Sequence, residues 1–128
     1  MNWKPLYAPW KSLIPTHADA ETLPAKLATP DKSWAYGAVT DLVETDKPAT
    51  IRIKAKGLSG KVGFCLISED YSNLASNQVL VTAQDKDATI ELKFEPEKSP
   101  ARLLVRNYND NGKTGEVEIA SVEISVAD

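Results

Sequence analysis

The residues best suited to binding a ligand lie in the segment ARLLVRNYNDNG, residues 101–112. In this segment Arg102 and Arg106 alternate with apolar residues, and Asn107 and Tyr108 follow directly, ahead of a run of Asn, Asp and Gly. Arginine supplies five N–H donors in a planar fork, and asparagine supplies both donors and an acceptor. Tyrosine adds an aromatic face next to a hydroxyl group. The segment therefore concentrates side chains that can hydrogen-bond to a polar ligand and stack against a ring.

The ligand that best matches these side chains is a saccharide. A sugar ring presents hydroxyl groups around its rim and an apolar face of C–H groups, so its recognition needs forked hydrogen-bonding groups beside an aromatic surface. Trp34 and Tyr36, in an earlier segment, have the same aromatic character. An arginine-lined groove would also suit an anionic sugar. We therefore expect a saccharide-binding site that consists of six residues: Arg102, Arg106, Asn107, Tyr108, Trp34 and Tyr36.

The same residues also have plainer interpretations. If the basic residues of the strands point outward, cross-strand pairs with glutamates would stabilise a solvated surface. Arg106 could pair with Glu118 in this way. The Asn-Gly pair at 111–112 suits a tight turn with positive φ. If the outward face binds nothing, the surroundings of Trp34 and the 69–78 loop are the next places to seek a site.

Catalytic chemistry finds little support in the sequence. The motifs GxGxxG, HExxH and GxSxG are absent. His17 stands alone in a proline-rich segment, and Cys65 lies in the middle of an apolar segment, where we expect a buried, inert thiol. The acidic pairs lie in a turn or on the polar side of a strand, and Asp110 is the only acid of its loop, which disfavours calcium. We expect a protein that is not an enzyme and has no cofactor and no metal site.

Bulk properties narrow the classes of partner. The net charge is −3 and the pI is about 5.2, the opposite of a typical nucleic-acid binder. No segment approaches the ~20 apolar residues that span a bilayer, and the N-terminus does not have the pattern of a signal peptide. We therefore expect a soluble protein with no nucleic-acid or membrane partner, cytoplasmic if this is the whole chain and otherwise of unknown location.

The elements that must position the site are strands. Apolar residues recur with period two along most of the chain from residue 51 to residue 126, which is typical of half-buried strands. Turn signals separate the alternating segments at intervals of about 10 residues, which favours an all-β sandwich with two antiparallel sheets. A change of phase across Ala120 and Ser121 predicts a β-bulge. A short helical turn is expected near Asp19–Leu23, with Asp19 as its cap.

The first 33 residues differ from the rest. They contain five of the eight prolines and two of the three tryptophans. Because proline cannot donate to a central ladder, we expect an irregular leader with one or two edge strands, packed on a sandwich that spans residues 34–128. Trp3, Tyr7 and Trp10 could instead form a contact surface for a protein partner or for a second copy of the chain.

Four segments, in this order, resemble galactose-binding-like jelly rolls, the fold of many carbohydrate-binding modules: WAYGAVTDLV, ATIRIKAKGLSGKVGFCLI, ATIELKF and ARLLVRNYNDNGKTGEVEIASVEI. In particular they are similar to small modules appended to bacterial glycan-assembly enzymes, such as sugar O-methyltransferases and glycosyltransferases. The resemblance implies a non-catalytic module that binds a saccharide or polysaccharide, with Trp34, Tyr36, Arg106, Asn107 and Tyr108 at the positions that fit such a site. The alternative it leaves open is a protein-interaction or oligomerisation module accessory to a glycan-processing enzyme or surface assembly.

Overall fold

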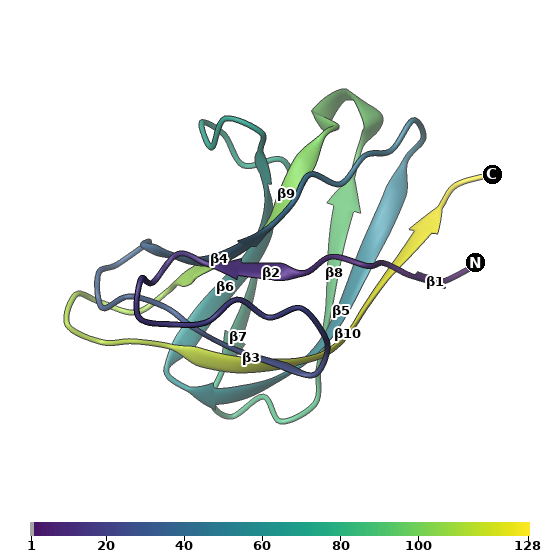
Figure 1. The fold of residues 1–128 in the computed structure, drawn as a ribbon. Coiled ribbons are helices and arrows are strands. Elements are labelled where there is room, and N and C mark those ends of the chain that lie inside the picture. Colours follow the sequence, from purple (N-terminus) through teal and green to yellow (C-terminus); the bar gives the residue numbers. More distant parts are fainter. Residues whose placement is uncertain (1) are drawn as a thin grey trace.

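A computed structural model describes residues 2–128 as two antiparallel sheets that face each other (Figure 1). In sheet A the order is β1 (Lys4–Pro5), β10 (Glu116–Val126), β5 (Ala49–Ser59) and β8 (Ala88–Phe94), and β3 (Ala25–Ala28) also pairs with β10. In sheet B the order is β2 (Trp10–Ser12), β4 (Tyr36–Thr40), β9 (Ala101–Asn107), β6 (Lys61–Ser68) and β7 (Val79–Thr82). A single 3₁₀ turn, η1 (Pro96–Lys98), precedes β9. The prediction of an all-β sandwich with two antiparallel sheets is confirmed.

The core lies between the sheets because each strand places its alternate apolar residues on one side. Sheet A contributes Ile51 and Ile53 of β5 and Leu92 of β8, which are completely buried. They belong to the same apolar cluster as Phe64 and Val105 of sheet B. The residues of β6 from 62 to 67 are all buried, as expected for a strand that is covered on both of its faces.

The strand β10 carries the predicted bulge. Its pairing with β5 shifts register between Ile119 and Ser121, so Ala120 has no partner on β5. The extra residue lets Ile119 before the bulge and Val122 after it both face the core, although they are three positions apart. The alternation of apolar residues alone was sufficient to locate this irregularity.

The leader supplies edge strands to both sheets. β1 pairs with β10 at residues 123–124 and β3 pairs with β10 at residues 116–119, while β2 pairs with β4. Trp10, at the start of β2, is only 1% exposed and belongs to the core. The division of the chain at residue 33 stays a prediction, but the strands of the leader are hydrogen-bonded parts of the sandwich.

The prediction of a helical turn near residues 19–23 is wrong. Ala20 forms an antiparallel bridge with Trp10, in which each backbone N–H donates to the other residue's carbonyl at 2.8–2.9 Å. Asp19 does not cap a helix, because its carboxylate accepts from the backbone N–H of Ser12. Ala20 is therefore held in a bridge and residues 22–24 form a bend, in place of the expected helical turn. Within residues 2–128 no helix has the length and the apolar character needed to span a bilayer.

Candidate binding site on the outer face of sheet B

The outer face of sheet B has an apolar floor. Val39 of β4, Leu104 of β9 and Cys65 of β6 are cross-strand neighbours, and together with Ile67 they form a second apolar cluster, separate from the core. All four are at most 2% exposed, although they face away from the other sheet. Tyr36 packs against this cluster. Larger side chains must therefore cover the floor from the outside.

Arg106, Trp34 and Tyr108 form one end of this cover. The Arg106 guanidinium carbon lies 4.7 Å from the centre of the Trp34 ring, within the range of a cation–π contact. The Tyr108 ring meets Trp34 edge-on, with 4.9 Å between ring centres and an interplanar angle of 76°. Arg106 also donates from Nε to Oε1 of Gln78 at 2.6 Å. Trp34 and Tyr108 remain 48% and 38% exposed, so both rings can contact a ligand.

Gly63 makes room for this end of the site. It pairs with Arg106 across the strands and lies on the same outer face. A Cβ at this position would lie 2.8 Å from Oε1 of Gln78 and 3.4 Å from the Tyr108 ring. The absence of a side chain at Gly63 therefore lets Gln78 and Tyr108 lie close over the sheet.

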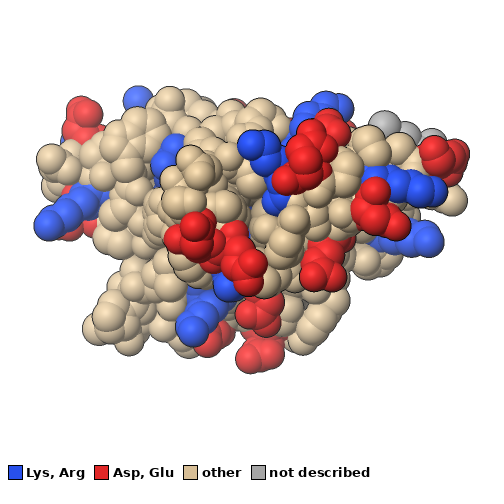
Figure 2. Space-filling model, turned by 90° about the horizontal axis from the view of Figure 1, so that it is seen from above, with Lys and Arg blue, Asp and Glu red and all other residues tan. Residues whose placement is uncertain are grey.

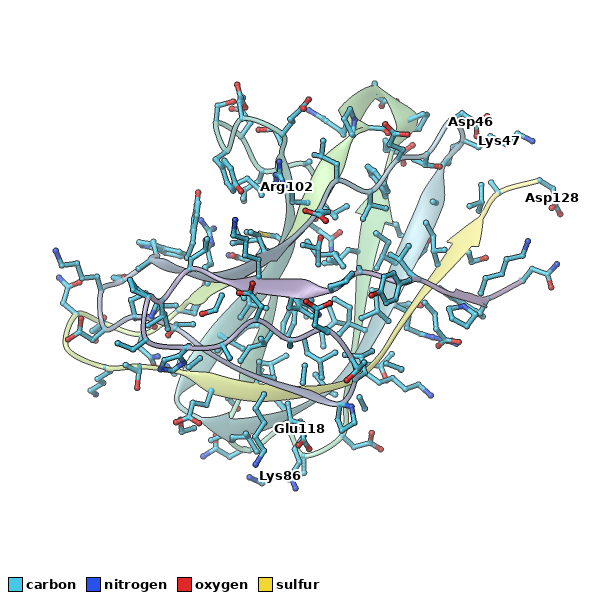
Figure 3. All side chains as sticks on the ribbon, in the orientation of Figure 1. Asp46, Lys47, Lys86, Arg102, Glu118 and Asp128 are labelled. Carbon is cyan, nitrogen blue, oxygen red and sulfur yellow. The ribbon has the colours of Figure 1, made fainter. Side chains whose placement is uncertain are left out.

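Arg102 and Tyr71 form the other end, and Tyr36, which pairs with Arg106 across the strands, links the two ends through its contact with Tyr71. The Arg102 guanidinium carbon lies 5.4 Å from the centre of the Tyr71 ring, and Tyr71 stacks on Tyr36 with 6.3 Å between ring centres and an angle of 30°. Arg102 donates from Nη1 to the Thr40 carbonyl at 3.3 Å, while its buried Nε has no partner within residues 2–128. Figure 3 shows Arg102 on β9, below the loop that joins β6 to β7.

Two of these aromatic residues have unusual backbones. Within residues 2–128, Trp34 and Tyr71 are the only non-glycine residues with positive φ, at 67° and 63°. Such a conformation costs about 1–3 kcal/mol for a bulky side chain and persists only where the surroundings enforce it. The Trp34 N–H donates to the Asn107 carbonyl, and the Tyr71 N–H donates to the Ser68 carbonyl. Both bonds hold the rings over sheet B.

The loop that carries Tyr71 is ordered around Asp70. Its Oδ1 accepts from the hydroxyl groups of Ser68 and Ser72 at 2.9 and 2.6 Å, and from the Ser72 backbone N–H at 3.1 Å. These hydrogen bonds stabilise the ionised carboxylate and so lower the pKa of Asp70, and the bond from the Ser72 hydroxyl has the largest effect. The carboxylate therefore stays ionised and serves the turn that presents Tyr71.

Asn107 lies beneath the site and not on it. It is completely buried, and its Nδ2 donates to the carbonyls of Pro30, Lys32 and Lys113 at 2.8–3.0 Å. Its Oδ1 accepts from the Asn109 N–H at 2.7 Å. The alternation that turns Arg106 outward turns its neighbour inward. Asn107 thus ties together the loops around Trp34, whereas the other five predicted residues lie on the outer face.

Sequence reasoning missed two participants. Tyr71 lies in the 69–78 loop, which the sequence suggested only as a second place to look, and no periodicity indicates where a loop side chain will point. Gln78 precedes β7, and no motif in the sequence marks it as a partner of Arg106. Pairing of Arg106 with Glu118 is wrong, because Glu118 belongs to β10 of sheet A and lies at the lower end of the molecule in Figure 3.

Cys65 lies in the floor, where its thiol is completely buried. Burial raises the pKa of its thiol to about 11, although the positive charge of Arg106 acts in the opposite direction. The thiol is therefore protonated near neutral pH, where only a thiolate would react. Within residues 2–128 no group of three or more His, Cys, Asp or Glu side chains is arranged to hold a metal ion.

The leader aromatics do not form one exposed patch. Trp10 is buried in the core, and the Arg52 guanidinium carbon lies 4.0 Å above the ring of Trp3. Tyr7 is 78% exposed beside a groove of about 470 Å³. The groove is lined mainly by apolar residues of the leader, including Pro5, Leu6, Pro9 and Leu23. A contact surface in the leader would therefore depend on Tyr7 and this groove.

No protein-family model matches the sequence, and no curated protein matches it. Solved structures match at low sequence identity. The chain aligns over 98% of its length, with a TM-score of 0.52 and 14% identity, to a structure of the CBM22-1 and GH10 modules of the endo-1,4-β-D-xylanase 10B of Clostridium thermocellum complexed with xylohexaose. It spans 26% of that xylanase chain.

Two further structures are similar. A cleaved adhesin domain of Lys-gingipain from Porphyromonas gingivalis aligns with 99% of this chain and 95% of its own, with a TM-score of 0.50 and 8% identity. A carbohydrate-binding module from Cellvibrio mixtus lichenase 5A, in complex with cellotriose, aligns with 98% of this chain and 91% of its own, with a TM-score of 0.49 and 6% identity. The likeness to the xylanase and adhesin structures confirms, for the fold, the predicted resemblance to carbohydrate-binding β-sandwiches.

Proposed function

We propose that this chain is a non-catalytic carbohydrate-binding module and that the outer face of sheet B is its ligand surface. The observation that carries the proposal is the pair of arginine–aromatic contacts over the apolar floor, Arg106 on Trp34 at one end and Arg102 on Tyr71 at the other. In both contacts the aromatic residue belongs to a loop and the arginine to the rigid strand β9.

The geometry suits an extended saccharide. Arg102 and Arg106 are four residues apart on one strand face, which corresponds to about 13 Å, longer than a single sugar ring. The exposed rings of Trp34 and Tyr108 can stack against the C–H face of a sugar, and the guanidinium groups and Gln78 can bond to its hydroxyls. Contacts within the protein already hold these groups, since Arg106 bonds to Gln78 and lies on Trp34 while Arg102 bonds to the Thr40 carbonyl, and this lowers the entropic cost of binding.

Two further observations support the proposal. The strained backbones of Trp34 and Tyr71 both occur at aromatic residues of this one surface, and such strain is concentrated at ligand-binding positions in proteins. In addition, a structure with this fold contains a CBM22-1 module and xylohexaose. At 14% identity this likeness concerns the fold alone, and the ligand of the present chain has to be found by experiment.

A glycan array with the purified chain, followed by calorimetry on the strongest hit, tests the proposal. Trp34→Ala should weaken binding at least tenfold, or about 1.4 kcal/mol, because it removes the stacking surface and the partner of Arg106. Trp3→Ala is the matched control, since Trp3 also contacts an arginine but directly precedes β1 and lies against Arg52 of sheet A. Equal binding by the parent and Trp34→Ala, or equal losses in both variants, would contradict the proposed site.

An alternative proposal is a protein-interaction or oligomerisation module. The observation that favours it is the exposed Tyr7 beside the apolar groove of the leader. A chain that binds no glycan of the array and is dimeric by light scattering would favour this alternative.

A further inference from the structure

The charges of the two sheets differ in a way that bears on the ligand. The five strands of sheet B contain no Asp or Glu, whereas sheet A contains four glutamates. Four basic residues occupy outward positions of sheet B: Lys11, Lys61, Arg102 and Arg106. Lys11 pairs with Val39 of the floor, and Lys61 lies two residues before Gly63, so both share the face of the arginines. Although the net charge of the chain is −3, the charged strand residues on this face are therefore all basic.

The two arginines of this face retain their charge for a ligand. Within residues 2–128 the one salt bridge joins Arg52 to Glu123 in sheet A. Arg106 donates to the neutral amide of Gln78, and Arg102 donates to the carbonyl of Thr40. A guanidinium has five N–H donors, so these bonds use only a part of each fork.

Acidic residues near the face lie in loops. Glu69 and Asp70 precede Tyr71, and Asp70 is bonded to serine hydroxyls and to a backbone N–H. Asp41 follows β4, and Asp31 and Asp110 lie in the loops near Trp34. The end view in Figure 2 shows acidic and basic groups together on the end from which the 69–78 loop projects. None of these carboxylates forms a salt bridge with Arg102 or Arg106.

We infer that this face selects anionic saccharides, which bear carboxylate or sulfate groups, over neutral ones. The inference rests on the proposed function and names its ligand class. Arginine binds a carboxylate or sulfate through two parallel charge-assisted hydrogen bonds, which are about twice as strong as neutral ones. A neutral sugar offers the same arginines only hydroxyl groups. The unpaired guanidinium groups and the absence of strand acids therefore favour a charged ligand.

Matched polymers test the inference. The purified chain is titrated with polygalacturonate and with its fully methyl-esterified form, and with dextran sulfate and dextran, to separate carboxylate from sulfate. At least one acidic polymer should bind tenfold or more tightly than its neutral counterpart at the same salt concentration. This difference in affinity should become smaller as the sodium chloride concentration rises, because salt screens exposed charges.

Paired variants locate the effect. Arg102→Gln/Arg106→Gln should abolish the preference for the acidic polymer, with an unchanged circular dichroism spectrum as proof of folding. Lys54→Gln/Lys56→Gln removes the same charge from exposed positions of sheet A and should keep the preference. Equal loss in both pairs would overturn the inference, because it would show attraction to diffuse positive charge.

The remaining outcomes separate this inference from the proposed function. Equal binding of acidic and neutral polymers that is still weakened by Trp34→Ala overturns the acidic preference alone. Binding of none of these four polymers overturns the acidic preference, and the proposed function falls with it only if the glycan array also yields no ligand. Tighter binding of oligo-dT than of any polysaccharide also overturns both, since aromatic rings beside basic residues can hold single-stranded nucleic acid.

Discussion

The outer faces of the two sheets are covered by different kinds of side chain. On sheet A, Arg52 lies between Glu91 and Glu123 in the strand register, and its guanidinium bonds to Glu123 at 3.0 Å. On sheet B, Arg106 lies between Tyr36 and Gly63, and its guanidinium lies on Trp34. One solvated cross-strand pair of the kind considered from the sequence, Arg52 with Glu123, is thus present on sheet A, while sheet B carries a second buried layer.

This difference indicates what the fold alone requires. Mixed charges are sufficient to keep sheet A solvated, so a sandwich of this size does not need an apolar outer floor. The floor of Val39, Cys65, Ile67 and Leu104 is therefore an addition to the fold. Its position beneath the arginines and aromatic rings is what a rigid binding surface needs.

The largest expected effect concerns the floor. Leu104→Ala should lower the free energy of unfolding by about 2–5 kcal/mol, as for a core leucine, because Leu104 is completely buried. Lys54→Ala, on the exposed face of sheet A, should change it by no more than about 0.5 kcal/mol. Urea denaturation measures both. Similar small changes in the two variants would show that the floor is not a second buried layer.

A chemical probe sharpens the same contrast. With a pKa of about 11 instead of the ordinary 9.0, Cys65 has about a hundredfold less thiolate at pH 8. Ellman's reagent should therefore label the native chain very slowly and the urea-unfolded chain rapidly. A Lys54→Cys variant, with a second cysteine on sheet A, should gain one rapidly labelled thiol. Rapid labelling of the native parent would show that the floor opens to solvent.

The smallest effect is expected on sheet A. Arg52→Ala removes the ion pair with Glu123, whose two side chains are 25% and 26% exposed, and the contact with Trp3. Partly exposed pairs of this kind contribute about 0–1 kcal/mol, so thermal unfolding should shift only slightly. Glycan binding should be the same as in the parent. A loss of binding would move the ligand surface to sheet A and remove the contrast between the faces.

Sequence patterns predicted most of the strands because alternation is a local property. The strands β5, β6, β8 and β9 and the bulge in β10 all follow from apolar residues at period two. The leader strands are two to four residues long and pair with residues far away in sequence, so their partners leave no local pattern.

The candidate site was predictable only in part, for a similar reason. Arg106 in β9 and Tyr108 just beyond the end of that strand share a face because they are two residues apart along the chain. Trp34 joins them through a loop that Asn107 holds, and Tyr71 comes from another loop. Asn107 was placed with its neighbours by type, while its phase along the strand directs it inward. Residue type suggested the chemistry, and only the fold shows which of these side chains lie on the outer face of sheet B.

The leader strands also have a consequence for how the chain behaves outside its own fold. β1 and β3 together cover residues 116–119 and 123–124 along one edge of β10, and β2 covers the edge of β4. An uncovered edge offers unpaired N–H and C=O groups to any extended chain, including another copy of the same protein. A fragment that begins at residue 34 would expose both edges at once, next to the apolar alternation of β10. Such a fragment should form intermolecular β-sheet and precipitate on expression, so the leader keeps the sandwich from acting as a template for aggregation.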